Sequence, residues 1–112
     1  MEEDREDGYR GRLEAELVAL DAEDVLGAAG QKTVELDQTS VGRLSRMDAM
    51  QGQAMAKATG VRRAQRRQRI AAAFGRMEDG EFGYCTTCGE EIAPARLDLD
   101  PTVPTCIGCA AG

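Results

Sequence analysis

The residues with the clearest chemistry are the four cysteines, all of which lie in the C-terminal part of the chain. Cys85 and Cys88 have two residues between them, as do Cys106 and Cys109, and 17 residues separate the two pairs. Two thiolates on one tight turn can bind the same tetrahedral ion, and this spacing is typical of a zinc ribbon. The sequence therefore predicts one structural Zn²⁺ held by Cys85, Cys88, Cys106 and Cys109. A redox dithiol, an iron centre and disulfides are the alternatives.

A catalytic role for this metal site is disfavoured by the same ligand set. A catalytic zinc ion keeps one position open for water or substrate, whereas four thiolates fill every position of a tetrahedral ion. The sequence contains no histidine, which excludes a histidine as acid, base or ligand, and no further cysteine that could act as a nucleophile. We therefore expect a closed, inert metal site and a protein that is not an enzyme.

Charged side chains are sorted along the sequence. The 112 residues carry a formal net charge of −6, but residues 1–37 contribute −8, residues 38–76 contribute +8 and residues 77–112 contribute −6. This segregation is explained most simply if the acidic first segment lies beside the basic second one. Aromatic residues make up only 4% of the chain and tryptophan is absent, which favours helix packing over a sandwich or a barrel.

A first amphipathic helix is predicted from Tyr9 to about Leu26, because apolar residues recur there at helical spacing. Residues 1–8 are nearly all charged and are interpreted as a disordered acidic tail. Gly27 and Gly30 are expected to end the helix, since glycine readily adopts the left-handed conformation of a helix terminus. The apolar stripe of this helix consists of Leu13, Leu17, Val18, Leu20 and Val25.

A second, longer helix is predicted from the DQTS segment to about Met77. At ~1.5 Å per residue, its roughly 35 to 40 residues would span about 50 to 60 Å. Its apolar side is expected to consist of Val41, Leu44, Met47, Ala54, Ala58, Val61, Ala64, Ile70, Phe74 and Met77.

Two helices of opposite charge joined by a short turn predict an antiparallel hairpin. The fold class is therefore mainly α, a coiled-coil-like helical hairpin followed by a small four-cysteine zinc ribbon. The predicted boundaries are the acidic tail at 1–8, the hairpin at 9–82 with a tip region at about 27–51, and the zinc finger at 83–112.

The segment VRRAQRRQRI places five arginines within eight residues, and Arg62, Arg66 and Arg69 share one helix face. A basic face beside a zinc ribbon could bind nucleic acid. It could also pair, at least in part, with the acidic side chains of the first helix. The sequence pI of about 4.7 disfavours phosphate binding, so internal pairing is the preferred interpretation. The acidic candidates are Glu14, Glu16, Asp21, Glu23 and Asp24.

The sequence gives no sign of a membrane span or a secretory leader. No stretch reaches the ~20 apolar residues of a membrane helix. The chain begins MEEDREDG, whereas a leader would begin with a basic segment followed by an apolar one. We therefore expect a cytoplasmic protein, in a compartment that keeps thiols reduced.

The order of these features resembles the DksA/TraR family of bacterial transcription regulators. The similarity runs from about Tyr9 to Cys109 and is strongest in FGYCTTCGEEIAPARLDLDPTVPTCIGC, with support from ELDQTSVGRLSRMDAMQGQAMA. The resemblance implies a regulator that binds RNA polymerase, inserts its hairpin into the secondary channel of the polymerase, and does not bind DNA. We expect it to act as a monomer.

The resemblance also implies an acidic hairpin tip that approaches the catalytic magnesium region of the polymerase. Family tips usually carry two aspartates and an alanine within a few residues. Here the candidates are Asp48 and Ala49, with Asp37 as a further acidic group, and Ser45 stands where the earlier aspartate would fall. The alternative for Asp48 is a solvated helix residue. The residues expected to contact the channel rim or to brace the hairpin are Arg62, Arg66 and Arg69.

Some members of the family bind guanosine tetraphosphate between the base of the hairpin and the ribbon. Arg62 and Arg69 stand at basic positions of the long helix, but Asp100 and Ala110 occupy the two ribbon positions that are basic in those relatives. An acidic side chain there would repel a phosphate. We therefore expect the dependence on this nucleotide to be weak or absent.

Two further function classes remain open. One is a zinc-ribbon protein that binds nucleic acid through its arginine-rich helix, and its affinity would fall steeply with added salt. The other is a thiol redox protein, which would have to release zinc under oxidant as a functional event.

Overall fold

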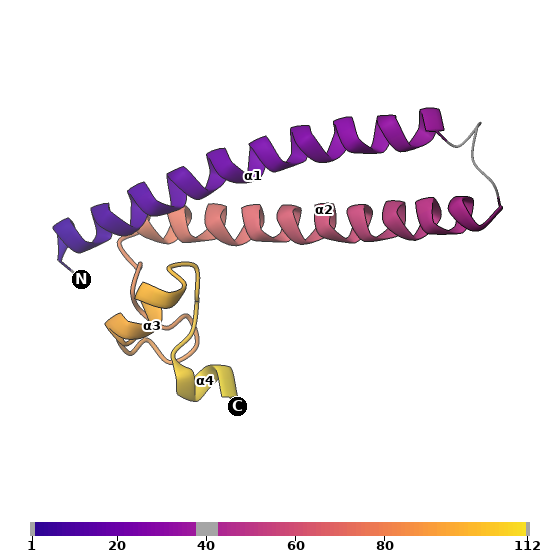
Figure 1. Cartoon of the computed structure of the whole chain (residues 1–112). Helices are drawn as coiled ribbons and strands as arrows, with labels where there is room; N and C mark the ends of the chain where they lie inside the picture. Colours follow the sequence, from indigo (N-terminus) through magenta and orange to yellow (C-terminus); the bar gives the residue numbers. More distant parts are fainter. Residues whose placement is uncertain (1, 38–42, 112) are drawn as a thin grey trace. The chain divides into compact units, whose positions relative to one another are not determined.

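The computed structural model describes the backbone of residues 2–37 and 43–111, and the side chains of residues 2–27 and 47–111. Its helices in chain order are α1 (Glu3–Asp37), α2 (Arg43–Glu78), α3 (Pro94–Leu99) and α4 (Ile107–Ala111) (Figure 1). The predicted mainly α fold is confirmed. The chain forms two compact units, which are unit 1 (residues 1–17 and 67–112) and unit 2 (residues 18–66).

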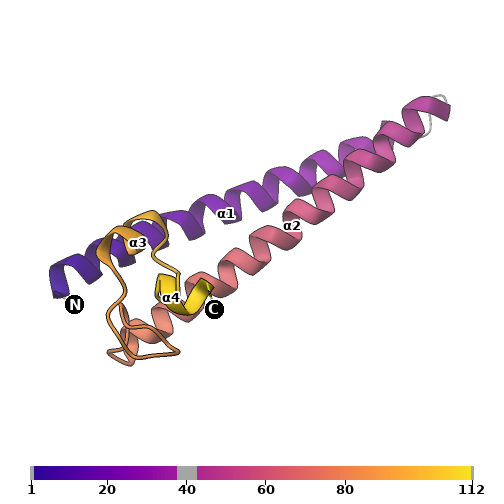
Figure 2. The same ribbon diagram turned by 90° about the horizontal axis from the view of Figure 1, so that it is seen from below.

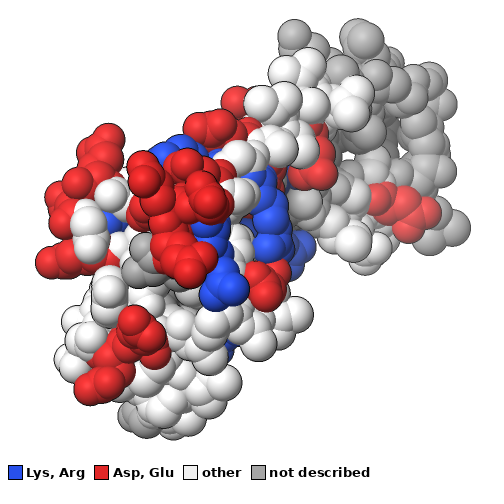
Figure 3. Space-filling model, turned by 90° about the vertical axis from the view of Figure 1, so that its left-hand side faces the viewer, with Lys and Arg blue, Asp and Glu red and all other residues white. Residues whose placement is uncertain are grey.

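The two long helices have nearly equal length, against the prediction. α2 has 36 residues, close to the predicted helix, whereas α1 has 35 residues and starts at Glu3. Residues 3–8 are therefore helical and not a disordered tail. The carboxylates of Glu3, Asp4 and Glu6 fall in the first turn, where the positive end of the helix dipole stabilises them. Figure 3 shows acidic side chains crowded on the face where α1 begins.

Gly27 lies inside α1, so the prediction that it ends the helix was wrong. A Cβ atom at this position would lie 3.2 Å from Nη2 of Arg63, so the missing side chain makes room for this guanidinium. Arg63 donates a hydrogen bond from Nε to Oδ1 of Asp24 over 2.5 Å, and its side chain is only 15% exposed. A helical glycine costs up to ~1 kcal/mol relative to alanine. The ion pair across the two helices offsets this cost in unit 2.

The side of α2 that faces α1 in unit 2 carries small and polar residues. The partly buried positions of α2 alternate at spacings of four and three residues, which is the heptad pattern of a coiled coil. We call this set the seam; it consists of Ala49, Gln53, Ala56, Gly60 and Arg63. The polar members explain why the seam was not recognised as the inward face of the helix from the sequence.

Large apolar side chains of unit 2 lie outside the seam. The predicted inward positions Val18, Val25, Met47 and Val61 are all more than half exposed. The predicted inward orientation was therefore wrong for these four residues, whereas Leu17 and Leu20 of the predicted stripe are partly buried. The exposed large apolar residues of unit 2 are Val18, Val25, Leu26, Met47, Met50, Met55 and Val61, with exposed fractions of 51–72%.

Unit 1 holds the hydrophobic core. Leu13 of α1 and Ile70, Ala73 and Met77 of α2 are buried, as the apolar periodicity predicted for Leu13, Ile70 and Met77. The rings of Tyr9 and Phe82 pack at a centroid distance of 5.9 Å. In both ribbon views α3 lies beside the first turns of α1 (Figures 1 and 2). The buried apolar residues that the C-terminal segment adds are Phe82, Cys85, Ile92 and Leu97.

Within residues 2–37 and 43–111, none of the helices combines the length and the apolar character that a membrane span requires.

Candidate zinc centre

The first cysteine pair lies on a tight turn that follows α2. The amide of Cys85 donates to the carbonyl of Glu90 over 2.8 Å, and the amide of Gly89 donates back to the carbonyl of Cys85 over 2.9 Å. Gly83 and Gly89 flank the turn with φ angles of +90° and +78°, a region that favours glycine. The amide of Cys88 points at Sγ of Cys85 over 3.5 Å. This turn brings both thiols to one side.

The second cysteine pair lies at the start of α4. The amide of Ala110 donates to the carbonyl of Cys106 over 2.9 Å, which places Cys109 on the same helical turn as Cys106. A backbone hydrogen bond of 2.8 Å from Thr86 to Pro104 joins the two cysteine-bearing segments. Both pairs are thus positioned by backbone hydrogen bonds.

The four sulfur atoms form a compact cluster. Sγ of Cys85, Cys88, Cys106 and Cys109 all lie within 4.8 Å of one another, and the Cys88–Cys106 pair is 3.8 Å apart. Four Zn–S bonds of ~2.3 Å in a tetrahedron require S–S distances of about 3.8 Å. A disulfide would need about 2.05 Å, and all four cysteines are free thiols. The donor set and its spacing therefore fit one structural zinc ion, as the sequence predicted.

The thiols have very different proton affinities. The pKa of Cys85 is lowered to about 6, first by a hydrogen bond from the amide of Cys88 and then by one from Cys106. The pKa of Cys109 is raised to about 12, first by its hydrogen bond with the thiol of Cys106 and then by those with Cys85 and Cys88. Four thiolates at this spacing require a compensating cation, so zinc binding must release protons and is favoured by higher pH.

Polar contacts attach the zinc finger to α1 inside unit 1. The hydroxyl of Tyr9 donates to Oδ1 of Asp98 over 2.5 Å, and Nη1 of Arg12 donates to the carbonyl of Asp98 over 2.7 Å. Nη2 of Arg12 lies 3.5 Å from the carbonyl of Leu99. The arginine therefore caps the free carbonyls at the C-terminal end of α3, where a positive charge is favourable. We call Tyr9, Arg12 and Asp98 the clasp.

Two further arginines hold the chain between α3 and the second cysteine pair. Nη2 of Arg76 on α2 donates to the carbonyl of Thr102 over 3.2 Å, and burial lowers the pKa of Arg76. Nε of Arg96 donates to the carbonyl of Thr105 over 2.9 Å, next to Cys106. These bonds fix the approach of the chain to the zinc site.

The clasp gives unit 1 a predictable dependence on alkaline pH. The pKa of Tyr9 is raised, first by burial and then by the hydrogen bond to Asp98 and the negative charge of that carboxylate. Because the pKa of Tyr9 is higher in the folded state than in the unfolded state, protonated Tyr9 stabilises the fold, and this stabilisation is fully present below the unfolded-state pKa of about 10. It is lost as the pH rises through the folded-state pKa of Tyr9. We expect the thermal midpoint, measured by circular dichroism, to fall as the pH rises above about 10.

The variant Tyr9→Phe keeps the ring against Phe82 and removes the hydroxyl. It is expected to lose about 1 kcal/mol at neutral pH and to show a flatter alkaline slope. Tyr84→Phe is the matched control, because Tyr84 is the other tyrosine of the chain. If the thermal midpoint of Tyr9→Phe falls with alkaline pH as steeply as that of the wild type, the hydroxyl does not have this role.

The predicted tip residues lie at the helix ends that adjoin residues 38–42. Asp37 is the last residue of α1, and Ser45, Asp48 and Ala49 lie in the first two turns of α2. The side chains of Asp37 and Ser45 lie outside the described residues. Asp48 is exposed, and Ala49 is partly buried in the seam. Of the two tip candidates whose side chains are described, Asp48 is thus the one that a partner could reach from solvent.

The predicted basic face is only partly exposed. Arg62 and Arg69 are exposed, whereas Arg66 is partly buried. Nη2 of Arg62 lies 3.4 Å from the hydroxyl of Thr59, one turn earlier on α2. The ion pair with α1 is made by Arg63, which lies beside this face, and by Asp24, one of the predicted acidic partners. Partial internal pairing is therefore confirmed for one arginine.

Asp100 has a structural role that the sequence did not reveal. Its Oδ1 accepts hydrogen bonds from the amide and the hydroxyl of Thr102, at 3.0 and 2.7 Å, and so closes the turn around the buried Pro101. An Asp-x-Thr segment after a helix is the sequence signal for such a turn. Ala110 is exposed on α4.

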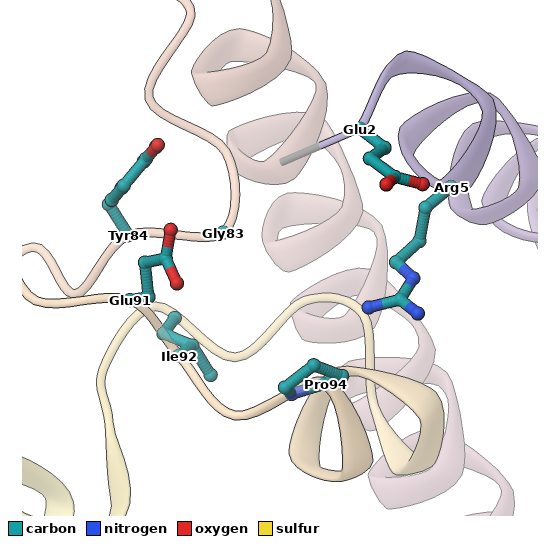
Figure 4. Close-up of a pocket in the computed structure, with 7 residues that line it drawn as sticks. All are labelled: Glu2, Arg5, Gly83, Tyr84, Glu91, Ile92 and Pro94. Atoms are coloured by element: carbon teal, nitrogen blue, oxygen red, sulfur yellow. The ribbon is translucent and has the colours of Figure 1, made fainter.

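Two hollows border the zinc finger. The first has a volume of about 80 Å³ and lies between the start of α1 and the first cysteine turn, with Arg5 directed toward Pro94 (Figure 4). The second, of about 300 Å³, lies beside Cys85. Typical small-molecule pockets measure about 300 to 1,000 Å³. Among the described residues that line the two hollows, Arg5 is the only basic one, so neither offers the cationic lining of a polyphosphate site.

The zinc finger is similar in sequence to known proteins. Residues 80–112 match the family model of the prokaryotic dksA/traR C4-type zinc finger. The RNA polymerase-binding transcription factor DksA of Haemophilus influenzae is 43% identical over 42 residues, which cover 38% of this chain and 29% of that protein. DksA of Escherichia coli K12 is also 43% identical over 42 residues, with 38% and 28% covered. The matched stretch spans less than a third of these curated relatives.

The similarity in fold extends over nearly the whole chain. Transcription factor DksA2 from Pseudomonas aeruginosa superposes with a TM-score of 0.85 at 22% sequence identity, over 99% of this chain and 84% of that one.

Proposed function

We propose that the protein is a regulator of transcription that binds RNA polymerase, because residues 80–112 match the family model of the prokaryotic dksA/traR C4-type zinc finger. It acts through the secondary channel of the polymerase with the tip between α1 and α2, without sequence-specific DNA binding and without enzymatic activity. It works in the cytoplasm as a monomer.

The observation that carries the proposal is the shared core of unit 1. The zinc finger buries Phe82, Ile92 and Leu97 in the same core as Leu13 of α1 and Ile70 of α2. The finger therefore stabilises the base of two long helices, and its closed metal site leaves no position for a substrate. A closed metal site of this kind has a structural role, so the residues that act on the polymerase are expected elsewhere in the chain. Asp48, exposed near the start of α2, is the proposed working residue at the tip.

The charges favour a protein partner over nucleic acid. The net charge is −6, and Arg63 is engaged by Asp24. Nucleic-acid binders that rely on phosphate contacts present a continuous basic surface. Arg62 and Arg69 are exposed and are proposed to contact the rim of the channel, with Arg66 beside them.

The two zinc-finger positions that are basic in nucleotide-binding relatives are occupied here by Asp100 and Ala110. This supports the proposal that polymerase binding depends only weakly, or not at all, on guanosine tetraphosphate. The carboxylate of Asp100 is fixed in the turn by Thr102, so its negative charge stays in place, and Ala110 offers no charge to a phosphate.

The proposal is tested by competition on RNA polymerase. The labelled protein is bound to core polymerase, and a known secondary-channel binder is titrated in. Displacement is expected, and guanosine tetraphosphate is expected to change the affinity by less than about twofold. In transcription assays Asp48→Asn is expected to bind with unchanged affinity and to lose most of the effect on promoter complexes.

The same assays include a control variant at the start of α2. Gln51→Glu alters another exposed residue of the same helix end and is expected to keep the effect of the wild type. Absence of binding, or binding that the competitor leaves in place, would refute the proposal. Strong, salt-sensitive retention of DNA or RNA on a filter would instead support the nucleic-acid alternative.

A further inference from the structure

One face of α2 in unit 2 is apolar although it lies outside the seam. Met47, Met50, Ala54, Ala58 and Val61 follow one another at helical spacing and are all exposed, and the three larger side chains are 51–64% exposed. We call these five residues the outer stripe. At ~3.6 residues per turn its centre lies about 140° around the helix from the centre of the seam, so α1 does not cover it.

The fold does not account for the outer stripe. The seam uses only small and polar residues of α2, while the methionines and Val61 face outward. No member of the outer stripe is charged, although an exposed helix face in a soluble protein is normally polar. A contiguous apolar surface of this kind marks an interaction site.

The shape of the outer stripe suits a helix. Two alanines, Ala54 and Ala58, lie one turn apart in its middle, and larger side chains lie at both ends. Small residues permit close approach of a second helix backbone, and the end residues can pack on either side of it. Methionine adapts to irregular partner surfaces because its side chain is unbranched and flexible.

The borders of the outer stripe are basic. Lys57 lies on one side of it and Arg62 on the other, and both are exposed. Residues 47–66 contain one acidic and four basic side chains. A partner that covers the stripe therefore gains most if acidic residues border its own apolar face.

From these observations we propose that the outer stripe of α2 binds an amphipathic helix of RNA polymerase whose apolar face is bordered by acidic side chains. This inference rests on the proposed function and adds a binding surface that is distinct from the tip. It assigns Ala54 and Ala58 to the centre of the contact, and Lys57 and Arg62 to its charged rim.

The test compares two alanine substitutions on the same helix. Ala54→Glu places a charge at the centre of the outer stripe, and Ala64→Glu places it at another exposed position, outside the stripe. Ala54→Glu is expected to weaken binding to core polymerase by about tenfold or more, and Ala64→Glu by less than about threefold. Circular dichroism and zinc content check that both variants are folded. Lys57→Glu is expected to slow association and to reduce its dependence on salt.

Each outcome separates this inference from the function on which it rests. A wild-type protein that fails to bind polymerase refutes the proposed function. A wild-type protein that binds, together with an Ala54→Glu variant that binds equally well, overturns the outer stripe alone. Sedimentation addresses a second copy of the chain as occupant: a wild-type dimer that Ala54→Glu converts to a monomer would also overturn the inference. A photocrosslinker at Ala58 is expected to label a helix of the polymerase.

Discussion

Replacement of Cys106 by serine is expected to abolish zinc binding and to unfold the zinc finger. Structural zinc contributes about 10 to 16 kcal/mol to the folding of isolated zinc-finger peptides, so the loss of one of four ligands removes a large share of the stability of the finger. Without zinc, the two cysteine segments are joined only by non-covalent contacts such as the Thr86–Pro104 hydrogen bond. Ile92 and Leu97 would then leave the core of unit 1, while the helices of unit 2 remain.

This expectation can be measured as zinc content and as protease sensitivity. Arg96 is protected in the folded finger, because it is partly buried and its Nε is bonded to the carbonyl of Thr105. Trypsin is expected to cleave Cys106→Ser after Arg96 rapidly and the wild type slowly. Thr87→Ser, an exposed position between two ligands, is the control that should retain zinc. A Cys106→Ser protein that keeps zinc and a protected Arg96 would show that the finger does not depend on this ligand.

The second large effect is expected for Ile70→Ala. The side chain of Ile70 is fully buried in the core of unit 1. Truncation of such a residue costs about 2 to 5 kcal/mol, from lost burial and from the cavity left behind. Small domains have a total stability of about 5 to 15 kcal/mol, so this loss is a large fraction of it.

Urea unfolding followed by circular dichroism measures this loss. Val61→Ala, on the same helix but 51% exposed, is the matched control and is expected to change the unfolding free energy by about 0.5 kcal/mol or less. Zinc content should be unchanged in both variants, because neither residue is a candidate zinc ligand. Equal destabilisation by the two substitutions would mean that the core of unit 1 does not hold the long helices to the finger.

The zinc site was predictable because its signal is local. Cys85 and Cys88 need only a tight turn to share an ion, and the flanking glycines and the CxxC spacing specify that turn. The contacts that position the site were not predictable in the same way. Tyr9 and Asp98 are 89 residues apart, and no spacing rule connects a tyrosine in one helix with an aspartate in a short later one.

The long helices were predicted in number and type, but their ends and inward faces were only partly right. Gly27 was interpreted as a helix end from its propensity, whereas the guanidinium of Arg63 occupies the space that its missing side chain leaves. Val61 was assigned to the inward face from its hydropathy, whereas Arg63 faces α1 through its ion pair with Asp24. Hydropathy cannot identify an inward face when that face is polar and the outer one is apolar.

The clasp has a consequence for the order in which the chain folds during synthesis. Arg12 leaves the ribosome 86 residues ahead of Asp98, the residue whose carbonyl it will bind. At a translation rate of about 5 to 20 residues per second, α1 waits roughly 4 to 17 s for its partner. During that interval α1 and α2 can already pair through Asp24 and Arg63, whereas unit 1 must be completed last. The nascent chain therefore exposes the apolar side chains of Leu13 and Ile70 until the zinc finger has been synthesised. Chaperones are expected to bind the chain mainly at this stage.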